Sequence, residues 1–95
     1  MPSNERRLAD LTHGPGEIDL HGMTVDEALP RLDEFIHAAY RAGYYQVRIV
    51  HGKGSGILRR EVGRYLSNHP LVRSHRLADR YHGGEGATQV ELSER

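Results

Sequence analysis

The sequence predicts an α/β domain: a two-layer sandwich in which two helices cover one face of a mixed four-stranded sheet. Two observations support this fold class. Apolar residues recur at every second position in four short segments and at every third or fourth position in two longer ones. The order of these segments is β-α-β-α-β-β, which places each helix between two strands. A chain of 95 residues is long enough for one such core and too short for two.

The folded domain is predicted to begin after a polar N-terminal segment. Residues 1–16 contain few apolar side chains and end in Gly14-Pro15-Gly16. This composition is typical of a flexible tail or linker, so we expect the domain to span residues 17–95.

The first strand is predicted at residues 17–21, where apolar and polar residues alternate. This period places Ile18 and Leu20 on the core side. Asp19 and His21 then share the opposite face of the same strand.

The first helix is predicted to begin at a capping box formed by Thr24 and Glu27 and to end at Gly43. Pro30 lies inside this helix, where it removes one backbone hydrogen bond and should bend the axis. We keep the helix because the apolar stripe continues on both sides of the proline: Val25, Ala28, Leu29, Leu32, Phe35, Ile36, Ala39 and Tyr40.

The second strand is predicted at residues 45–50, and a glycine-rich turn at residues 52–56 leads from it into the second helix. Residues 68–70 (Asn-His-Pro) end that helix. Its inner stripe consists of Leu58, Val62, Tyr65 and Leu66.

The last two strands are predicted at residues 72–81 and 87–92, joined by a glycine-rich loop at residues 82–86. Each strand–helix–strand unit upstream requires parallel strands and a right-handed crossover. Together these units give a mixed sheet.

Composition excludes several classes of protein. No cysteine is present, so neither a disulfide framework nor a thiolate metal site can form. No apolar run approaches a membrane span and no signal-peptide stretch is present, so we expect a cytoplasmic protein. Thirteen basic residues balance thirteen acidic ones, but the bases dominate residues 48–80. This asymmetry suits a polyanionic partner, although taken alone it favours the simpler interpretation of a solvated charged face.

The chemistry is predicted at the carboxyl ends of the first two strands, where ligands of such sheets bind. His21 and His51 stand there, each followed by glycine and then by a helix N-terminus. Helix N-termini favour phosphate, and glycine lets the backbone approach an anion closely. The predicted phosphate-binding residues of the turn are Gly52, Lys53, Gly54, Ser55 and Gly56.

Asp19 and His21 lie two residues apart, so their Cα atoms should be about 6.5–7 Å from each other on one face. Histidine is the natural proton donor or acceptor near neutral pH. The carboxylate could orient the ring or hold a divalent cation such as magnesium or manganese. A zinc site from His21, His51 and Asp19 is less favoured because cysteine is absent. We interpret the other histidines as surface or capping residues: His13, His37, His69, His75 and His82.

Three segments together resemble the Smr (small MutS-related) domain, which occurs alone and as the C-terminal module of the second type of MutS protein. They are Ile18-Asp19-Leu20-His21-Gly22, residues 47–54 (VRIVHGKG) and residues 83–92 (GGEGATQVEL), and with the first helix the resemblance covers residues 17–92. The glycine-rich turn alone would be a weak signal, because it matches neither the Walker loop nor the dinucleotide-binding fingerprint.

The resemblance implies a fold akin to the C-terminal domain of a bacterial translation initiation factor and an activity that nicks or cleaves DNA or RNA. The family's Leu-Asp-x-His element falls on Ile18, Asp19 and His21, with isoleucine in place of leucine. Its His-Gly-x-Gly element falls on residues 51–54. Some MutS-linked members carry arginine where this chain has His21.

The leading hypothesis is therefore an endonuclease of low sequence specificity. Asp19 and His21 would move protons or position water, while His51 and the turn would hold the scissile phosphate. The alternative is a binding module without turnover, which docks on branched DNA or on ribosome-bound RNA. A hydrolase of small nucleotides is a weaker third possibility. Flanking phosphates would contact the second helix through Arg59, Arg60 and Arg64.

Overall fold

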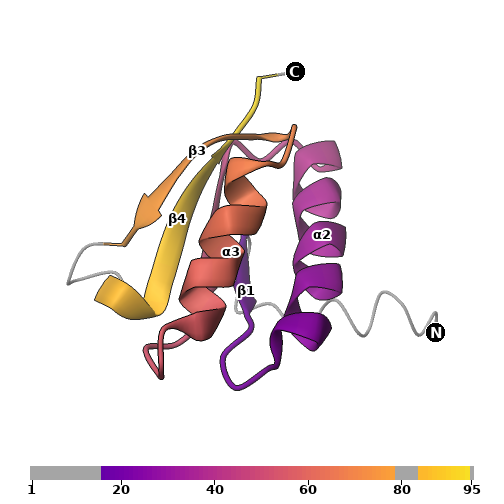
Figure 1. Ribbon diagram of the computed structural model, residues 1–95. Helices are drawn as coiled ribbons and strands as arrows, with labels where there is room; N and C mark the ends of the chain where they lie inside the picture. Colours follow the sequence, from indigo (N-terminus) through magenta and orange to yellow (C-terminus); the bar gives the residue numbers. More distant parts are fainter. Residues whose placement is uncertain (1–15, 79–83, 95) are drawn as a thin grey trace.

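The computed structural model describes residues 16–78 and 84–94, and it shows two helices on one side of a four-stranded sheet (Figure 1). The α/β two-layer class and the element order are confirmed. The elements are β1 (Glu17–Asp19), α2 (Val25–Arg41), β2 (Gln46–Val50), α3 (Ile57–Ser67), β3 (Val72–Leu77), a short 3-10 turn η2 (Gly84–Gly86) and β4 (Ala87–Leu92).

The sheet is mixed and has the strand order β1-β2-β4-β3. β1 and β2 are parallel, as the crossover through α2 requires. β4 lies between β2 and β3 and is antiparallel to both. The last strand of the chain therefore occupies an interior position, and β3 forms one edge of the sheet.

The core lies between the helices and one face of the sheet. Ile18 and Leu20 are both fully buried, as the alternation in the first strand predicted. The backbone N–H of Leu20 donates to the carbonyl of Val50 at 2.6 Å, which holds the ends of β1 and β2 together. The largest other side chains that are fully buried are Leu32, Ile36, Ile49, Val62, Leu66 and Val90.

Helix α2 begins and ends where its sequence predicted. The Thr24 hydroxyl accepts the Glu27 N–H at 3.2 Å, and the Glu27 carboxylate accepts the Thr24 N–H at 3.0 Å. Gly43 follows the helix with a φ of +93°, a conformation that favours glycine. The helix continues through Pro30. Neither α2 nor α3 combines the length and the apolar character needed to cross a membrane, and no other helix in the described residues does.

Strand β3 is shorter than predicted. It ends at Leu77 rather than at residue 81; the N–H of Ala78 still donates to the carbonyl of Ala87 at 2.9 Å. The 3-10 turn η2 occupies the last three residues of the predicted loop, directly before β4. The end of the predicted strand (residues 79–81), the first two residues of the predicted loop (82–83) and residues 1–15 of the predicted tail lie outside the described residues.

Candidate active site

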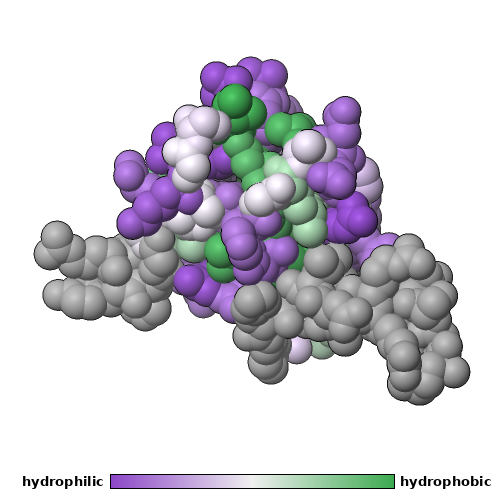
Figure 2. Space-filling model, turned by 90° about the horizontal axis from the view of Figure 1, so that it is seen from below, coloured by the Kyte–Doolittle hydropathy of each residue, from purple (hydrophilic) through white to green (hydrophobic). Residues whose placement is uncertain are grey.

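The carboxyl ends of β1 and β2 meet at one end of the molecule, the lower end in Figure 1. Figure 2 looks directly onto this end and shows mostly hydrophilic residues with apolar ones between them. A hollow of about 140 Å³ opens between the loop before α2 and the turn before α3. Its lining consists of Gly22, Met23, His51, Gly52, Lys53, Gly54, Ser55, Gly56, Leu58 and Arg59.

Asp19 and His21 form a hydrogen-bonded pair next to this hollow; they do not line it, but His21 lies against Gly52, which does. The Asp19 Oδ1 atom lies 2.6 Å from His21 Nδ1 and also accepts the backbone N–H of His21 at 3.0 Å. A carboxylate can only accept, so Nδ1 carries a proton and Nε2 is the acceptor of the neutral ring. The His21 side chain is 68% exposed and that of Asp19 is 15% exposed. The pair is thus a fixed carboxylate that orients an accessible imidazole.

Gly52 brings the phosphate turn against this pair. Its φ is +80°, and a Cβ atom there would lie 3.1 Å from the Cβ of His21. A side chain at this position would therefore be strained and would press on His21. The glycine permits the close approach of the two segments that the sequence predicted to form one site.

His51 has a different environment, because it is only 4% exposed. Its Nδ1 donates to the carbonyl of Gly52 at 3.0 Å, which leaves Nε2 to accept the Thr88 hydroxyl at 2.8 Å. Burial lowers the pKa of His51 below the ordinary value of 6.5; Arg59 lowers it further and the Gly52 carbonyl opposes this. Both ring nitrogens are thus occupied within the protein, and the ring is held neutral.

The start of β4 shapes the turn, and the sequence reasoning missed its contribution. The carbonyl of Gly86 accepts the N–H of His51 at 3.0 Å and the N–H of Gly52 at 2.9 Å. Thr88, two residues further on, holds the ring of His51. These contacts join positions more than thirty residues apart, so no local pattern could have shown them.

The turn presents backbone and cationic groups to the hollow. Gly56 caps α3 in the left-handed conformation and supplies no side-chain cap; the N–H of Ile57 donates to the Ser55 hydroxyl at 3.4 Å, a long contact that an anion at the start of the helix could replace. Lys53 is exposed and makes no ion pair within the described part of the chain. Arg59 lines the hollow and pairs with the exposed Glu85 at 3.5 Å.

The predicted helix arginines divide into two groups. Arg59 belongs to the site, as described above. Arg60 and Arg64 do not line the hollow, and both pair with Glu61, at 3.3 and 3.8 Å. These exposed pairs are weak, so the two side chains remain free to exchange Glu61 for phosphate.

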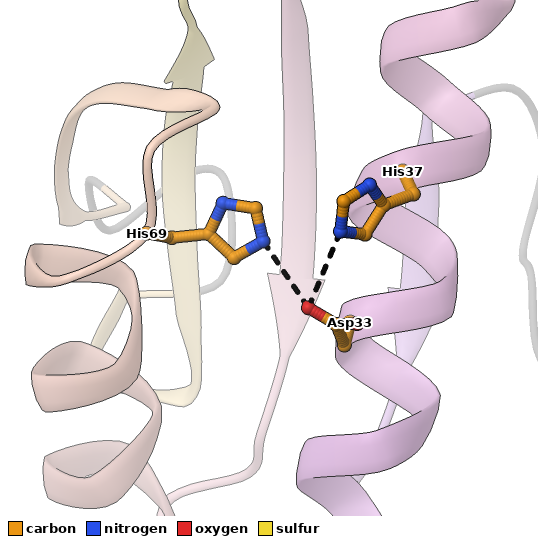
Figure 3. A group of neighbouring side chains, drawn as sticks. All are labelled: Asp33, His37 and His69. Atoms are coloured by element: carbon orange, nitrogen blue, oxygen red, sulfur yellow. Dashed lines mark hydrogen bonds and ion pairs between the residues drawn. The ribbon is translucent and has the colours of Figure 1, made fainter.

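A second cluster of ionisable groups lies between α2 and the end of α3 (Figure 3). The Oδ1 atom of Asp33 lies 3.2 Å from Nε2 of His69 and 3.6 Å from Nε2 of His37, and it also accepts the Tyr65 hydroxyl. These bonds, led by that from Tyr65, lower the pKa of Asp33 below its ordinary value. His69 was interpreted from sequence as a surface or capping residue; this was wrong, since only 8% of it is exposed.

The three ligand atoms of Asp33, His37 and His69 are close enough for a metal ion. The hydrogen bonding argues against one. The N–H of Leu71 donates to Nδ1 of His69 at 3.1 Å, so the ring proton sits on Nε2, which donates to Asp33. A metal on Nε2 would move that proton to Nδ1, where it would face the N–H of Leu71. The cluster is a clasp in which Asp33 of α2 accepts hydrogen bonds from Tyr65 and His69, with His37 beside it at ion-pair distance.

Comparison with known proteins agrees with this architecture. The family model described as the Smr domain matches residues 18–93. A protein named Endonuclease MutS2 from Enterococcus faecalis is 46% identical over 86 residues, covering 90% of this chain and 11% of the relative. Its counterpart from Thermomicrobium roseum is 51% identical over 76 residues, covering 80% of this chain and 10% of the relative.

Solved structures show the same fold. The Smr domain of Thermus thermophilus MutS2 superposes with a TM-score of 0.80 at 38% identity, covering 82% of this chain and 98% of that one. YdaL, a stand-alone small MutS-related protein from Escherichia coli, gives a TM-score of 0.79 at 31% identity, with coverages of 84% and 66%. The chain spans about a tenth of the length of the full MutS2 relatives. With the family model matched over nearly all of its described residues, the chain belongs to the Smr domain family.

Proposed function

We propose that this domain is an endonuclease that hydrolyses phosphodiester bonds of DNA or RNA with low sequence specificity. The observation that carries the proposal is the Asp19–His21 pair, whose exposed imidazole stands beside a turn suited to phosphate. A module that only binds nucleic acid has no physical need for a carboxylate-oriented imidazole at this position. The names of the MutS2 relatives support the same activity class.

In this proposal His21 is the acid–base group. Asp19 holds the proton on Nδ1, so Nε2 can take a proton from an attacking water or return it to the leaving oxygen. The carboxylate also stabilises the imidazolium that forms after proton transfer. General acid–base catalysis of this kind contributes about 10²- to 10⁴-fold in rate.

The turn at residues 52–56 would hold the scissile phosphate. Its glycine backbone, the start of α3 and Lys53 supply hydrogen-bond donors and positive charge where charge develops on the phosphate. Arg59 would contribute after releasing Glu85. His51 is assigned a positioning role, because Thr88 and Gly52 occupy both of its ring nitrogens.

Asp19 also fits a divalent cation of the magnesium type, which takes oxygen ligands and is commonly held by one or two carboxylates plus substrate phosphates. When bound, such an ion would add charge stabilisation at the phosphate. The chain's own part of the mechanism does not depend on it.

The test is cleavage of end-labelled DNA and RNA by the wild type and by the variants His21→Ala and Asp19→Asn, with and without chelator. We expect His21→Ala to lose cleavage and to keep nucleic-acid affinity and thermal stability, because an exposed strand-end side chain buries little. Asp19→Asn should slow cleavage less completely, since the ring remains but is no longer oriented. Cleavage by pure His21→Ala protein at the wild-type rate would refute the assignment.

A further inference from the structure

A second hollow adjoins the candidate active site. It has a volume of about 290 Å³, lies between α3 and the edge strand β3, and is lined by Arg59, Gly63, His75, Arg76, Leu77 and Thr88. Arg59 also lines the first hollow, and Thr88 holds His51. The two hollows therefore adjoin at Arg59, one at the phosphate turn and the other toward the edge of the sheet. We call the second one the α3–β3 groove.

Gly63 is the residue that keeps this groove open. It lies in the middle of α3, where glycine destabilises a helix by about 1 kcal/mol relative to alanine. Its φ is not in the left-handed region, and a Cβ atom there would meet only His75 Cε1, at an ordinary contact distance of 4.0 Å. The fold thus does not require glycine at this position. A side chain would instead extend into the groove.

The walls of the groove combine a fixed ring, an apolar side chain and cations. Ser67 donates its hydroxyl proton to the carbonyl of Gly63 at 3.0 Å, so its oxygen accepts Nε2–H of His75 at 2.9 Å and fixes that ring. Leu77 is 43% exposed beside it. Arg59, which pairs with the exposed Glu85 at 3.5 Å, and Arg76 supply positive charge, and none of the described residues that line the groove carries a carboxylate.

We propose that the α3–β3 groove binds the unpaired strand of nucleic acid next to the phosphate that is cleaved. Imidazole rings and apolar side chains stack on bases, and arginines contact the backbone. A hollow of about 290 Å³ has room for single bases but not for a duplex, whose major groove alone is about 12 Å wide. This inference rests on the proposed function, because it assigns the flanking part of the same substrate.

The experiment measures binding by fluorescence anisotropy in the His21→Ala background, with single-stranded DNA and RNA of three and nine nucleotides. The groove variant is Gly63→Glu, which places a carboxylate among the lining residues. Its control is Gln46→Glu, an exposed position on β2 with the same change of charge. Lengthening the strand should raise affinity by about tenfold or more in the parent, since one stacked base accounts for that much.

We expect Gly63→Glu to abolish this gain with length and to leave the trimer affinity unchanged, while Gln46→Glu keeps the gain. Gly63→Ala covers the case in which the glutamate variant does not fold: it should raise the melting temperature and reduce the gain several-fold. If the folded Gly63 variants keep the full gain in affinity between three and nine nucleotides, the proposal is overturned. It is also overturned if Gly63→Glu weakens binding of a blunt duplex as much as binding of the single strand.

The proposed function is judged separately, by cleavage in protein that retains His21. Absence of cleavage by every form would remove the endonuclease assignment and leave the binding result for the groove intact. If Gly63→Glu cleaves short substrates normally but loses the gain in affinity with strand length, the endonuclease assignment and the groove proposal are both supported.

Discussion

At the scale of single residues, His21 and His51 have similar sequence surroundings but different burial and different hydrogen-bond partners. Each was predicted to end a strand and precedes a glycine, and the pattern predicted that His21 moves protons while His51 holds the phosphate. In the structure β1 already ends at Asp19, so His21 lies in the turn that follows the strand. His21 is exposed and oriented by a neighbour two residues away, which the spacing anticipated. His51 is buried and bound by Thr88, a partner 37 residues away that no local spacing indicates. The burial of His51 and its bond to Thr88, neither of which the sequence pattern indicates, therefore distinguish it from His21.

Thr88→Val should weaken both the fold and the site. Valine has the shape of threonine but lacks the hydroxyl, so Nε2 of the buried His51 would lose its donor at a cost of about 1–3 kcal/mol. We expect a lower free energy of unfolding in urea and weaker oligonucleotide binding. Thr88→Ser should restore most of both, because it keeps the hydroxyl. Equal behaviour of the valine and serine variants would show that the hydrogen bond has no role.

His51 should also make stability depend on pH. Burial lowers its folded-state pKa, so on acidification the unfolded chain takes up the proton first. The stability from neutral His51 is therefore complete above pH 6.5, its ordinary pKa, and is lost as the pH falls below it. The difference in unfolding free energy between wild type and His51→Gln should shrink from pH 8 to pH 5. A constant difference over this range would contradict the burial of a neutral ring.

At the scale of elements, the helices and strands were predictable because their signals are local. The capping box at Thr24, the apolar stripes and Gly43 all act within one or two turns of chain. The 3-10 turn η2, which precedes β4, was not predicted, because its glycines indicated only a loop. The clasp between α2 and α3 was missed because Asp33 and His69 are far apart in sequence.

The clasp should be structural. Asp33→Ala leaves Nε2–H of the buried His69 without its acceptor, so we expect a loss of about 1–3 kcal/mol in unfolding free energy. Tyr65→Phe should cost less. Because the pKa of Asp33 is lowered in the folded state, its stabilisation is present above the ordinary value of 3.8 and is lost as the pH falls below it. A zinc-induced rise in melting temperature that Asp33→Ala abolishes would instead identify a metal site.

At the scale of the whole molecule, the fold class and the location of the site followed from the sequence, and the strand order did not. Parallel crossovers required β1 and β2 to point the same way, which placed His21 and His51 at one edge. Nothing local indicated that β4 would insert between β2 and β3. That insertion brings Gly86 and Thr88 to the turn, so the part of the site that was missed is the part that depends on strand order.

Balanced net charge makes salt dependence a whole-molecule test. If Lys53 and two or three neighbouring arginines contact phosphates, the slope of log K against log salt for duplex DNA should be near −3, at about −0.9 per contact. Lys53→Glu should flatten this slope by about one unit or more. Arg41→Glu, at the opposite end of α2, should leave it unchanged. Equal effects of the two reversals would mean that the charges act only through the overall field.

The central claim, that His21 is the acid–base group of a phosphodiesterase site, is tested most directly by chemical rescue. The measurement is the single-turnover cleavage rate of His21→Ala with and without added imidazole, beside the rates of wild type and Asp19→Asn. We expect His21→Ala to lose cleavage, imidazole to restore part of that loss, and the rate of Asp19→Asn, which keeps its own ring, to be unchanged by imidazole. Cleavage by His21→Ala at the wild-type rate, or a lost rate that imidazole does not raise, would contradict the account.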